Sequence, residues 1–365
     1  MRVAWADVVA RRLERSSLAP RAAGLVDVVS DVGGVQAQLQ SSAELQIAAR
    51  VDGLVQADVR SALWERRDLV KAWTLRGTLH LHPAAELPLW HAARRAVAAE
   101  DQSLPAWRDP NGKDHPPLGA EQVAAVRAAV RDVLDGRCLL REEIAEEVVA
   151  RVGPEPRARL SSGFAFFLGD LCQGPPRGAK VTFVRPDQWI DGWSEPTEDD
   201  ALREVTRRFL HAYGPARPRD FLEWFGGGRA PFEQLELDEV DVEGRSAYVL
   251  AGDTTFAGPQ RSVRLLPEYD AYVMGFRERD VLVPPAVREL VVARPRGRYE
   301  GPAGLRFLLV DGVTAGLWDR TKRGKRLELH VSPVRPLGKR ERSGLEAEAA
   351  RLGAFLGLEP VLTIG

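Results

Sequence analysis

Gly33-Gly34-Val35-Gln36-Ala37-Gln38 is the stretch around which the N-terminal part of the chain is predicted to fold. Two segments with helical spacing of apolar residues precede it, at about 4–17 and 21–32. Ser41, followed three residues later by Glu44, has the pattern of a capping box and predicts that another helix follows directly. Because glycine adopts backbone angles that other residues avoid, the stretch is predicted to form a turn between helices.

Gln36 and Gln38 are the two side chains of this turn with functional groups. They are two residues apart, so in an extended turn their carboxamides would point the same way. Two neutral amides can hold a water molecule or read a base edge, but they cannot act as a strong acid or base. Taken alone, such glutamines are more often solvated surface than a functional pair.

The composition is that of an ordinary globular protein, with 365 residues, 44% hydrophobic and 28% charged. The net charge of −1 excludes a uniformly basic protein, so a nucleic-acid binder would have to gather its positive charge on one face. Cys138 and Cys172 lack the spacing of a zinc site or a disulfide framework. With no apolar stretch of membrane-spanning length, we expect a cytoplasmic, reduced protein without a metal or a cofactor.

The fold class expected from the periodicity is mainly α with β wings (α+β). Three helices followed by the alternating pattern of 70–82, with a turn at Arg76-Gly77, are typical of a winged-helix unit. The plan repeats twice, and an array of such units would build an extended concave cleft. The expected domains are winged-helix unit 1 at 1–118, with a linker at 105–118, unit 2 at 119–196, unit 3 at 197–262, and a β-rich region with a basic hairpin and a final helix at 263–365.

Further elements follow from apolar spacing and turn residues. The expected helices are 84–100, 121–134, 141–152, 160–171, 199–213, 219–225, 231–236 and 344–356. Strands are expected at 181–184 and on both sides of Glu243-Gly244 and Asp311-Gly312, and a second C-terminal hairpin is expected over 318–327.

The densest cationic cluster of the chain lies at the tip of that last hairpin. It is either a solvated tip, as charge clusters usually are, or a finger that enters a DNA groove and neutralises phosphates. Its candidate DNA-binding residues are Arg320, Thr321, Lys322, Arg323, Lys325 and Arg326.

Other candidates lie at the first hairpin and near the C-terminal region. Arg76 is either a wing residue on phosphate or an ordinary exposed arginine. His80 and His82 share one strand face, but no third ligand stands at a typical spacing, so packing or DNA contact is favoured over zinc. Asp270 would pair with an arginine for structure or approach a cleft, and the sequence does not decide between these.

Several motifs together resemble the AlkZ/YcaQ family of bacterial DNA glycosylases over nearly the full chain. They are Val35-Gln36-Ala37-Gln38, Trp73-Thr74-Leu75-Arg76-Gly77-Thr78-Leu79-His80, Leu265-Leu266-Pro267-Glu268-Tyr269-Asp270, and Asp311-Gly312-Val313 with Gly316-Leu317-Trp318. The resemblance implies three tandem winged-helix units around a positively charged DNA-binding surface, and excision of N7-alkylated purines. It implies that Gln36 and Gln38, in the Gln-apolar-Gln form of the AlkZ branch, are catalytic. It also implies a hairpin in the cleft, placed here at Thr321–Arg326.

The resulting hypothesis is a monomeric, monofunctional glycosylase that acts on alkylated purines in double-stranded DNA, including bulky natural-product adducts and interstrand crosslinks. The alternatives are a winged-helix transcriptional regulator and a scaffold protein without chemistry. Loss of base release in a Gln36→Ala/Gln38→Ala variant would separate the enzyme from both. Preference for one operator sequence would support the regulator.

Overall fold

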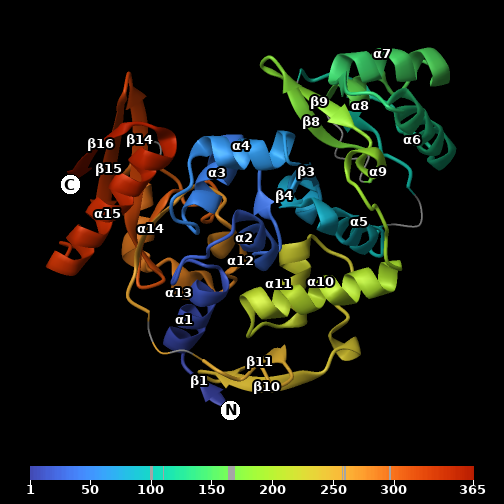
Figure 1. Ribbon diagram of the computed structural model, residues 1–365. Coiled ribbons are helices and arrows are strands. Elements are labelled where there is room, and N and C mark those ends of the chain that lie inside the picture. Colours follow the sequence, from blue (N-terminus) through green and yellow to red (C-terminus); the bar gives the residue numbers. More distant parts are fainter. Residues whose placement is uncertain (99–101, 110, 163–168, 257, 259, 296) are drawn as a thin grey trace. The chain divides into compact units, whose positions relative to one another are not determined.

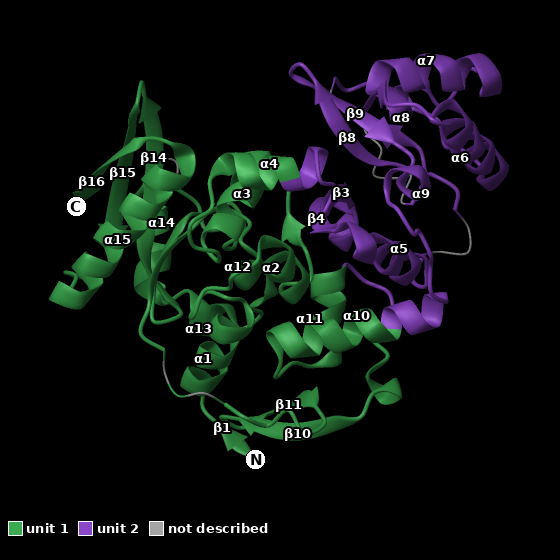
Figure 2. Ribbon diagram, in the orientation of Figure 1, with its two compact units in different colours: residues 1–61, 203–225, 230–365 green, residues 62–202, 226–229 purple. Residues whose placement is uncertain are grey.

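The computed structural model describes residues 1–98, 102–109, 111–162, 169–256, 258, 260–295 and 297–365 (Figure 1). Two compact units make up the chain, and each is described here by itself (Figure 2). Unit 1 comprises residues 1–61, 203–225 and 230–365, and unit 2 comprises residues 62–202 and 226–229. No helix within the described ranges is both long enough and apolar enough to cross a membrane.

The N-terminal part of unit 1 follows the expected order of helix, helix, turn and helix. Its elements are α1 (Trp5–Arg15), α2 (Leu25–Asp31), β2 (Val35–Gln36) and α3 (Gln40–Ala48), followed by α4 (Gln56–Trp64). Gly33 and Gly34 have φ angles of 67° and 100°, which explains why glycines form this turn. The helices expected at 4–17 and 21–32 are thereby confirmed.

A five-stranded sheet in the order β12-β13-β14-β15-β16 forms the C-terminal part of unit 1. Its strands are β12 (Val263–Leu266), β13 (Phe307–Val310), β14 (Val313–Arg323), β15 (Arg326–Pro333) and β16 (Glu359–Ile364), and the helices of this region are α12 (Ala271–Gly275), α13 (Arg279–Leu282), α14 (Pro285–Ala293) and α15 (Lys339–Leu356). Leu266, Phe307 and Leu317 of the sheet pack with Val9 and Leu13 of α1 in one core. The first helix and the last sheet therefore stabilise each other.

A smaller sheet of unit 1 joins the beginning of the chain to residues 237–250. Its strands are β1 (Arg2–Val3), β10 (Leu237–Val242) and β11 (Arg245–Leu250), and α10 (Glu198–Tyr213), α11 (Pro218–Phe225) and η3 (Phe232–Gln234) precede β10 in the chain. β1 pairs parallel to β10, with Val3 opposite Val242. The sequence did not predict this pairing, because two residues are too short to show an alternating pattern.

Unit 2 contains a sheet in which strands follow the order β4-β3-β8-β9-β7. The strands are β3 (Leu69–Trp73), β4 (Leu79–Pro83), β7 (Leu139–Leu140), β8 (Cys172–Arg177) and β9 (Lys180–Val184). The other elements are η1 (Leu75–Gly77), η2 (Ala84–Glu86), α5 (Leu87–Arg95), β5 (Trp107–Arg108), β6 (Asp114–His115), α6 (Ala120–Val133), α7 (Arg141–Val152), α8 (Arg157–Ser162) and α9 (Pro186–Trp189). Val130, Ile144, Leu160 and Phe183 belong to its core, so helices α6, α7 and α8 pack with β9.

Most expected hairpins and helices are confirmed, and the following expectations are wrong. The stretch 105–118 is not only a linker, because Trp107 pairs with His115 in the small hairpin of β5 and β6. The final helix begins at Lys339, five residues earlier than expected. Ser41 and Glu44 do not form a capping box, since α3 already begins at Gln40. Of the helices expected at 84–100 and 160–171, the parts at 99–100 and 163–168 lie outside the described residues, and the expectation is wrong for 96–98 and 169–171, which are not helical.

Candidate active site and DNA-contact residues

Gln36 lies in β2, where its backbone oxygen is hydrogen-bonded and its side chain is buried. Its side chain is buried, with 8% of the residue exposed, whereas Gln38 in the following turn is exposed. The backbone oxygen of Gln36 accepts a hydrogen bond from Nε2 of Gln46, at 3.1 Å. Within the described part of the chain, the buried side-chain oxygen of Gln36 has no hydrogen-bond partner. A buried acceptor without a partner is costly, so a water molecule or ligand that donated to this oxygen would remove that cost.

Gln46 connects this motif to a distant segment of unit 1. It is fully buried in α3, and its Oε1 accepts a hydrogen bond from the backbone N–H of Ala271 at 3.1 Å. Its amide thus donates to the motif and accepts from the start of α12. These two bonds fix the orientation of the Gln46 amide, because a backbone carbonyl only accepts and a backbone N–H only donates. Gln46 is therefore a positioning residue that sequence reasoning missed.

Arg50 and Asp270 form a buried ion pair next to Gln46. The two guanidinium nitrogens donate to the carboxylate at 2.7 and 2.8 Å, and both side chains are fully buried. Arg50 also donates to the backbone oxygen of Gln46 at 2.9 Å. Burial lowers the pKa of Arg50, but the charge and hydrogen bonds of Asp270 outweigh it, so the pKa lies above its ordinary value. Asp270 also caps α12 through the N–H of Tyr272, and the structural interpretation of this aspartate is the correct one.

Glu268 lies on the same segment and touches the N-terminal half of α3. Its backbone oxygen accepts a hydrogen bond from the Ser42 hydroxyl. Its carboxylate accepts from Arg306 at 2.9 and 3.0 Å. Burial raises the pKa of Glu268, but the hydrogen bonds from Arg306 outweigh it and leave the pKa below its usual range. Glu268 is therefore an ionised carboxylate.

Arg320, at the base of the basic hairpin, shares the electrostatic environment of that carboxylate. Burial lowers its pKa, and the positive charge of Arg306 lowers it further, whereas Glu268 and Glu44 of α3 raise it. Glu44 is itself buried and accepts from Gln56 and Arg60 at 2.6 and 3.0 Å. The base of the hairpin and the helix that follows the glutamine motif therefore belong to one charged network.

The tip of this hairpin is exposed and cationic. β14 and β15 pair from Gly316 to Arg323, and Gly324 has a φ of 60° at the turn. Arg323 lies 3.1 Å from Glu328, while Lys322 and Lys325 form no ion pair with any residue that the structure describes. The exposed residues of the tip are Thr321, Lys322, Arg323, Lys325 and Arg326. Such a tip offers uncompensated positive charge to an anionic partner.

Arg76 and His80 belong to the first hairpin, in unit 2. Arg76 lies in the turn with a φ of 54°. His80 is 1% exposed; its Nδ1–H donates to the Thr78 carbonyl at 3.0 Å, and its Nε2 lies 3.5 Å from a guanidinium nitrogen of Arg76. Burial, followed by the charge of Arg76, lowers the pKa of His80 to about 3. His80 is therefore a neutral, buried side chain that stabilises the turn at Arg76 through its contacts with Thr78 and Arg76.

The expected site residues therefore fall into two groups. Gln36 and Gln38 lie in unit 1 together with the basic hairpin, and α3 touches both the motif and the segment of Glu268. Arg76 and His80 lie in unit 2. Nothing in the spacing of the sequence indicated Gln46, whose two partners are 10 and 225 residues away. Glu268 could have been predicted from its place two residues before Asp270, in one of the motifs that carry the family resemblance.

Comparison with known proteins gives a consistent result. The family model described as "DNA glycosylase AlkZ-like" matches residues 29–355. The chain is 31% identical over 380 residues to the "Interstrand DNA cross-link repair glycosylase" of Streptomyces sahachiroi, and the match covers 98% of both chains. The solved structure of Streptomyces sahachiroi DNA glycosylase AlkZ matches with a TM-score of 0.83 and 31% identity over the full length of both chains. These findings support an enzyme over a regulator.

Proposed function

The chain belongs to the family of AlkZ-like DNA glycosylases, and we propose that it hydrolyses the N-glycosidic bond of N7-alkylated purines in double-stranded DNA. The chemistry of such a lesion suits a site built from amides. Alkylation at N7 gives the purine a positive charge. When the bond between C1′ and N9 breaks, its electron pair neutralises that charge, and the base leaves without needing a strong acid.

The remaining task of the site is to tolerate positive charge on the sugar and to place a water molecule, whose oxygen forms the new bond to C1′ and whose proton passes to the solvent. The side-chain oxygens of Gln36 and Gln38 do both in the proposed mechanism, because they accept hydrogen bonds from water and direct their dipoles at the developing cation. The observation that carries this proposal is the buried side-chain oxygen of Gln36, which lacks a partner among the described residues. An unmodified purine would remain uncleaved, because the site offers no proton to a poor leaving group.

DNA binding is assigned in this proposal to the two hairpins. The exposed tip Thr321–Arg326 neutralises phosphates near the lesion, and Arg320 joins it to the charged network of α3. Arg76 contacts the backbone, and His80 supports Arg76 rather than touching DNA, because it is buried. We further propose three winged-helix units, at 1–118, 119–196 and 197–262, that present a concave surface before the region 263–365.

The substrate class follows from the relative. Its name assigns it to interstrand crosslinks, and we propose that this chain also accepts bulky adducts and crosslinks, as a monomer, in the cytoplasm. Base release is the direct test. Duplexes that carry N7-methylguanine, a bulky N7 adduct or an N7–N7 crosslink are incubated with the protein, and the released bases are measured by mass spectrometry.

Each result of that assay has a defined meaning. Release of the methyl base indicates broad repair, and release of the bulky or crosslinked adducts alone indicates protection against a DNA-damaging natural product. The absence of release from all three substrates, together with a preference for one operator sequence over random duplex, would replace the glycosylase by the regulator.

A further inference from the structure

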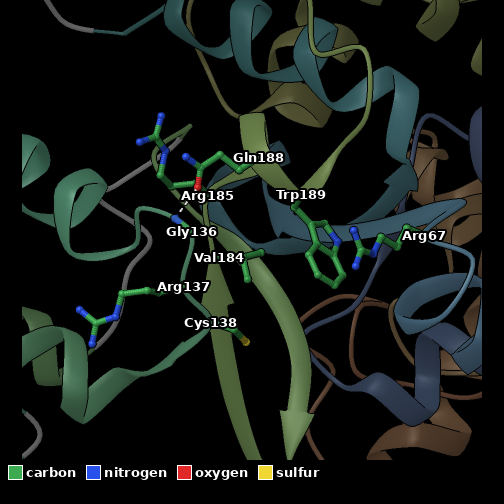
Figure 3. A pocket seen from close by; sticks show the side chains of 8 residues that line it. All are labelled: Arg67, Gly136, Arg137, Cys138, Val184, Arg185, Gln188 and Trp189. Carbon is green, nitrogen blue, oxygen red and sulfur yellow. Dashed lines mark hydrogen bonds between the residues drawn. The ribbon is translucent and has the colours of Figure 1, made fainter.

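A cavity in unit 2 has features that the proposed chemistry does not use. Its volume is about 240 Å³, and Figure 3 shows side chains from four separate segments around it. Arg67 comes from the loop before β3, Gly136 and Cys138 from the connection of α6 to β7, Val184 from the end of β9, and Trp189 from α9. All of them belong to unit 2, so the cavity is formed within one compact body.

Arg67 and Trp189 form a stacked pair at this cavity. The guanidinium carbon lies 3.8 Å from the centroid of the indole ring, which is close for a cation–π contact. A guanidinium over a ring face can still direct N–H groups away from the ring, and two such groups match two oxygens of a phosphate. Arg67 is exposed, so this edge is open to a ligand.

Arg67 differs from the other two arginines of the cavity, because its charge is not neutralised by a described carboxylate. Arg137 donates to both oxygens of Glu147 at 2.6 and 2.7 Å, and Arg185 pairs with Asp187 and Asp135. By contrast, no described carboxylate lies within ion-pair distance of Arg67. Among the residues that the structure describes, carboxylates therefore pair with Arg137 and Arg185 but none pairs with Arg67.

The backbone of Arg67 is held in an unfavourable conformation. Its φ is 59°, in the left-handed region that a residue with a side chain rarely adopts. Such strain persists where the surroundings fix it and is frequent at ligand sites. The contact with the indole ring restricts the positions that the guanidinium can occupy, so less side-chain freedom is lost when a ligand binds.

We propose that Arg67, stacked on Trp189, binds a phosphate group of the DNA backbone. The inference rests on the proposed function for the identity of the ligand, since a DNA glycosylase must hold a phosphodiester chain. The cavity is smaller than the usual small-molecule site and has room for a phosphate group. The contact is sequence-independent and adds to the affinity for both damaged and undamaged duplexes.

The test measures the affinity of the full-length protein for an undamaged fluorescent duplex as the salt concentration varies. Arg67→Ala and Arg67→Gln are expected to weaken binding about tenfold at low salt and to reduce the slope of log Kd against log salt by about 0.9, the value for one phosphate contact. Arg67→Lys retains the charge but loses the paired N–H donors of the guanidinium, so it should retain the salt-dependence slope while binding the duplex more weakly. Trp189→Phe should stay close to wild type, because the aromatic face remains.

Arg66→Ala is the matched control, because Arg66 is the neighbouring arginine and donates to Asp68 at 2.7 Å. Its slope should equal that of wild type. An unchanged slope and affinity in both Arg67→Ala and Arg67→Gln, or the same change in Arg66→Ala, would overturn the proposal. Titration with inorganic phosphate separates the two sources of the anion: phosphate binding through Arg67, with DNA affinity independent of Arg67, would also overturn it. Base release is measured in parallel, so a failed glycosylase and a failed phosphate site give different results.

Discussion

The side-chain amide of Gln46 donates from Nε2 to the backbone oxygen of Gln36 at 3.1 Å and accepts from Ala271 on its other side. The position of Gln46 predicts a pH-dependent activity for the variant Gln46→Glu. In Gln46→Glu, an ionised carboxylate would turn an acceptor toward the Gln36 carbonyl, and the motif would shift. A protonated carboxyl would again donate. We therefore expect base release to be slowed about tenfold or more at pH 8 and to recover as the pH falls, mainly through kcat.

Wild type and Thr314→Val serve as controls for that profile. Thr314 donates a buried hydrogen bond to the Leu282 carbonyl at 2.8 Å, in the same unit but away from the motif. Its removal costs stability without touching Gln36. A Gln46→Glu profile parallel to both controls would show that Gln46 has a structural role only.

The ion pair of Arg50 and Asp270 should be a strong determinant of stability. Asp270→Asn leaves a buried guanidinium without a counter-charge, which typically costs about 3–5 kcal/mol. Urea unfolding followed by tryptophan fluorescence measures this loss. Glu300→Gln removes an exposed partner of Arg298 and should leave the midpoint unchanged. Equal midpoints for Asp270→Asn and wild type would contradict the assignment.

Two buried histidines of unit 2 predict an acid-sensitive fold. Burial lowers the pKa of His80 and of His91 to about 3, with a further contribution from Arg76 and Arg95 respectively. The unfolded chain takes up a proton near pH 6.5 while the folded chain does not, so stability falls as the pH drops from about 6.5 toward 3. Between pH 7 and 5 each histidine should cost about 2 kcal/mol.

The difference between wild type and a variant isolates this contribution. His91→Gln should reduce the stability change between pH 7 and 5 by about 2 kcal/mol, as measured by urea unfolding at both values. Most carboxylates remain ionised throughout this range and cancel in the comparison. An identical pH dependence in the two proteins would mean that His91 takes up its proton as readily in the folded chain as in the unfolded chain, and would contradict its lowered pKa.

The hairpin tip predicts a change in salt dependence. Lys322 and Lys325 are exposed, and replacing both by alanine should reduce the slope of log Kd against log salt by about 1.8 if each contacts one phosphate. Lys339→Ala, at the start of α15, is the control for lost charge. Should both proteins keep the wild-type slope, the tip would be a solvated loop.

The sequence predicted those parts of the fold that have local signals. The turn at Gly33-Gly34 and the hairpin around Gly324 follow from glycine positions and from alternating residues. Pairing of Asp270 with an arginine was one of two alternatives, but Arg50 could not be predicted as the partner, because the two residues are 220 positions apart. The capping-box prediction for Glu44 was wrong, because its carboxylate accepts hydrogen bonds from Gln56 and Arg60 in a buried network instead. Gln36 and Gln38 were predicted as site residues from a sequence motif, whereas the role of Gln46 becomes visible only from its contacts in the folded chain.

The most direct test of the account is single-turnover release of N7-methylguanine from a duplex by wild type and by Gln36→Ala/Gln38→Ala. We predict that the double variant binds the duplex within about twofold of wild type and releases the base at least about a hundredfold more slowly, because it has lost the positioned dipoles. Release at the wild-type rate by a folded, DNA-bound double variant would contradict the central claim that these two amides perform the chemistry.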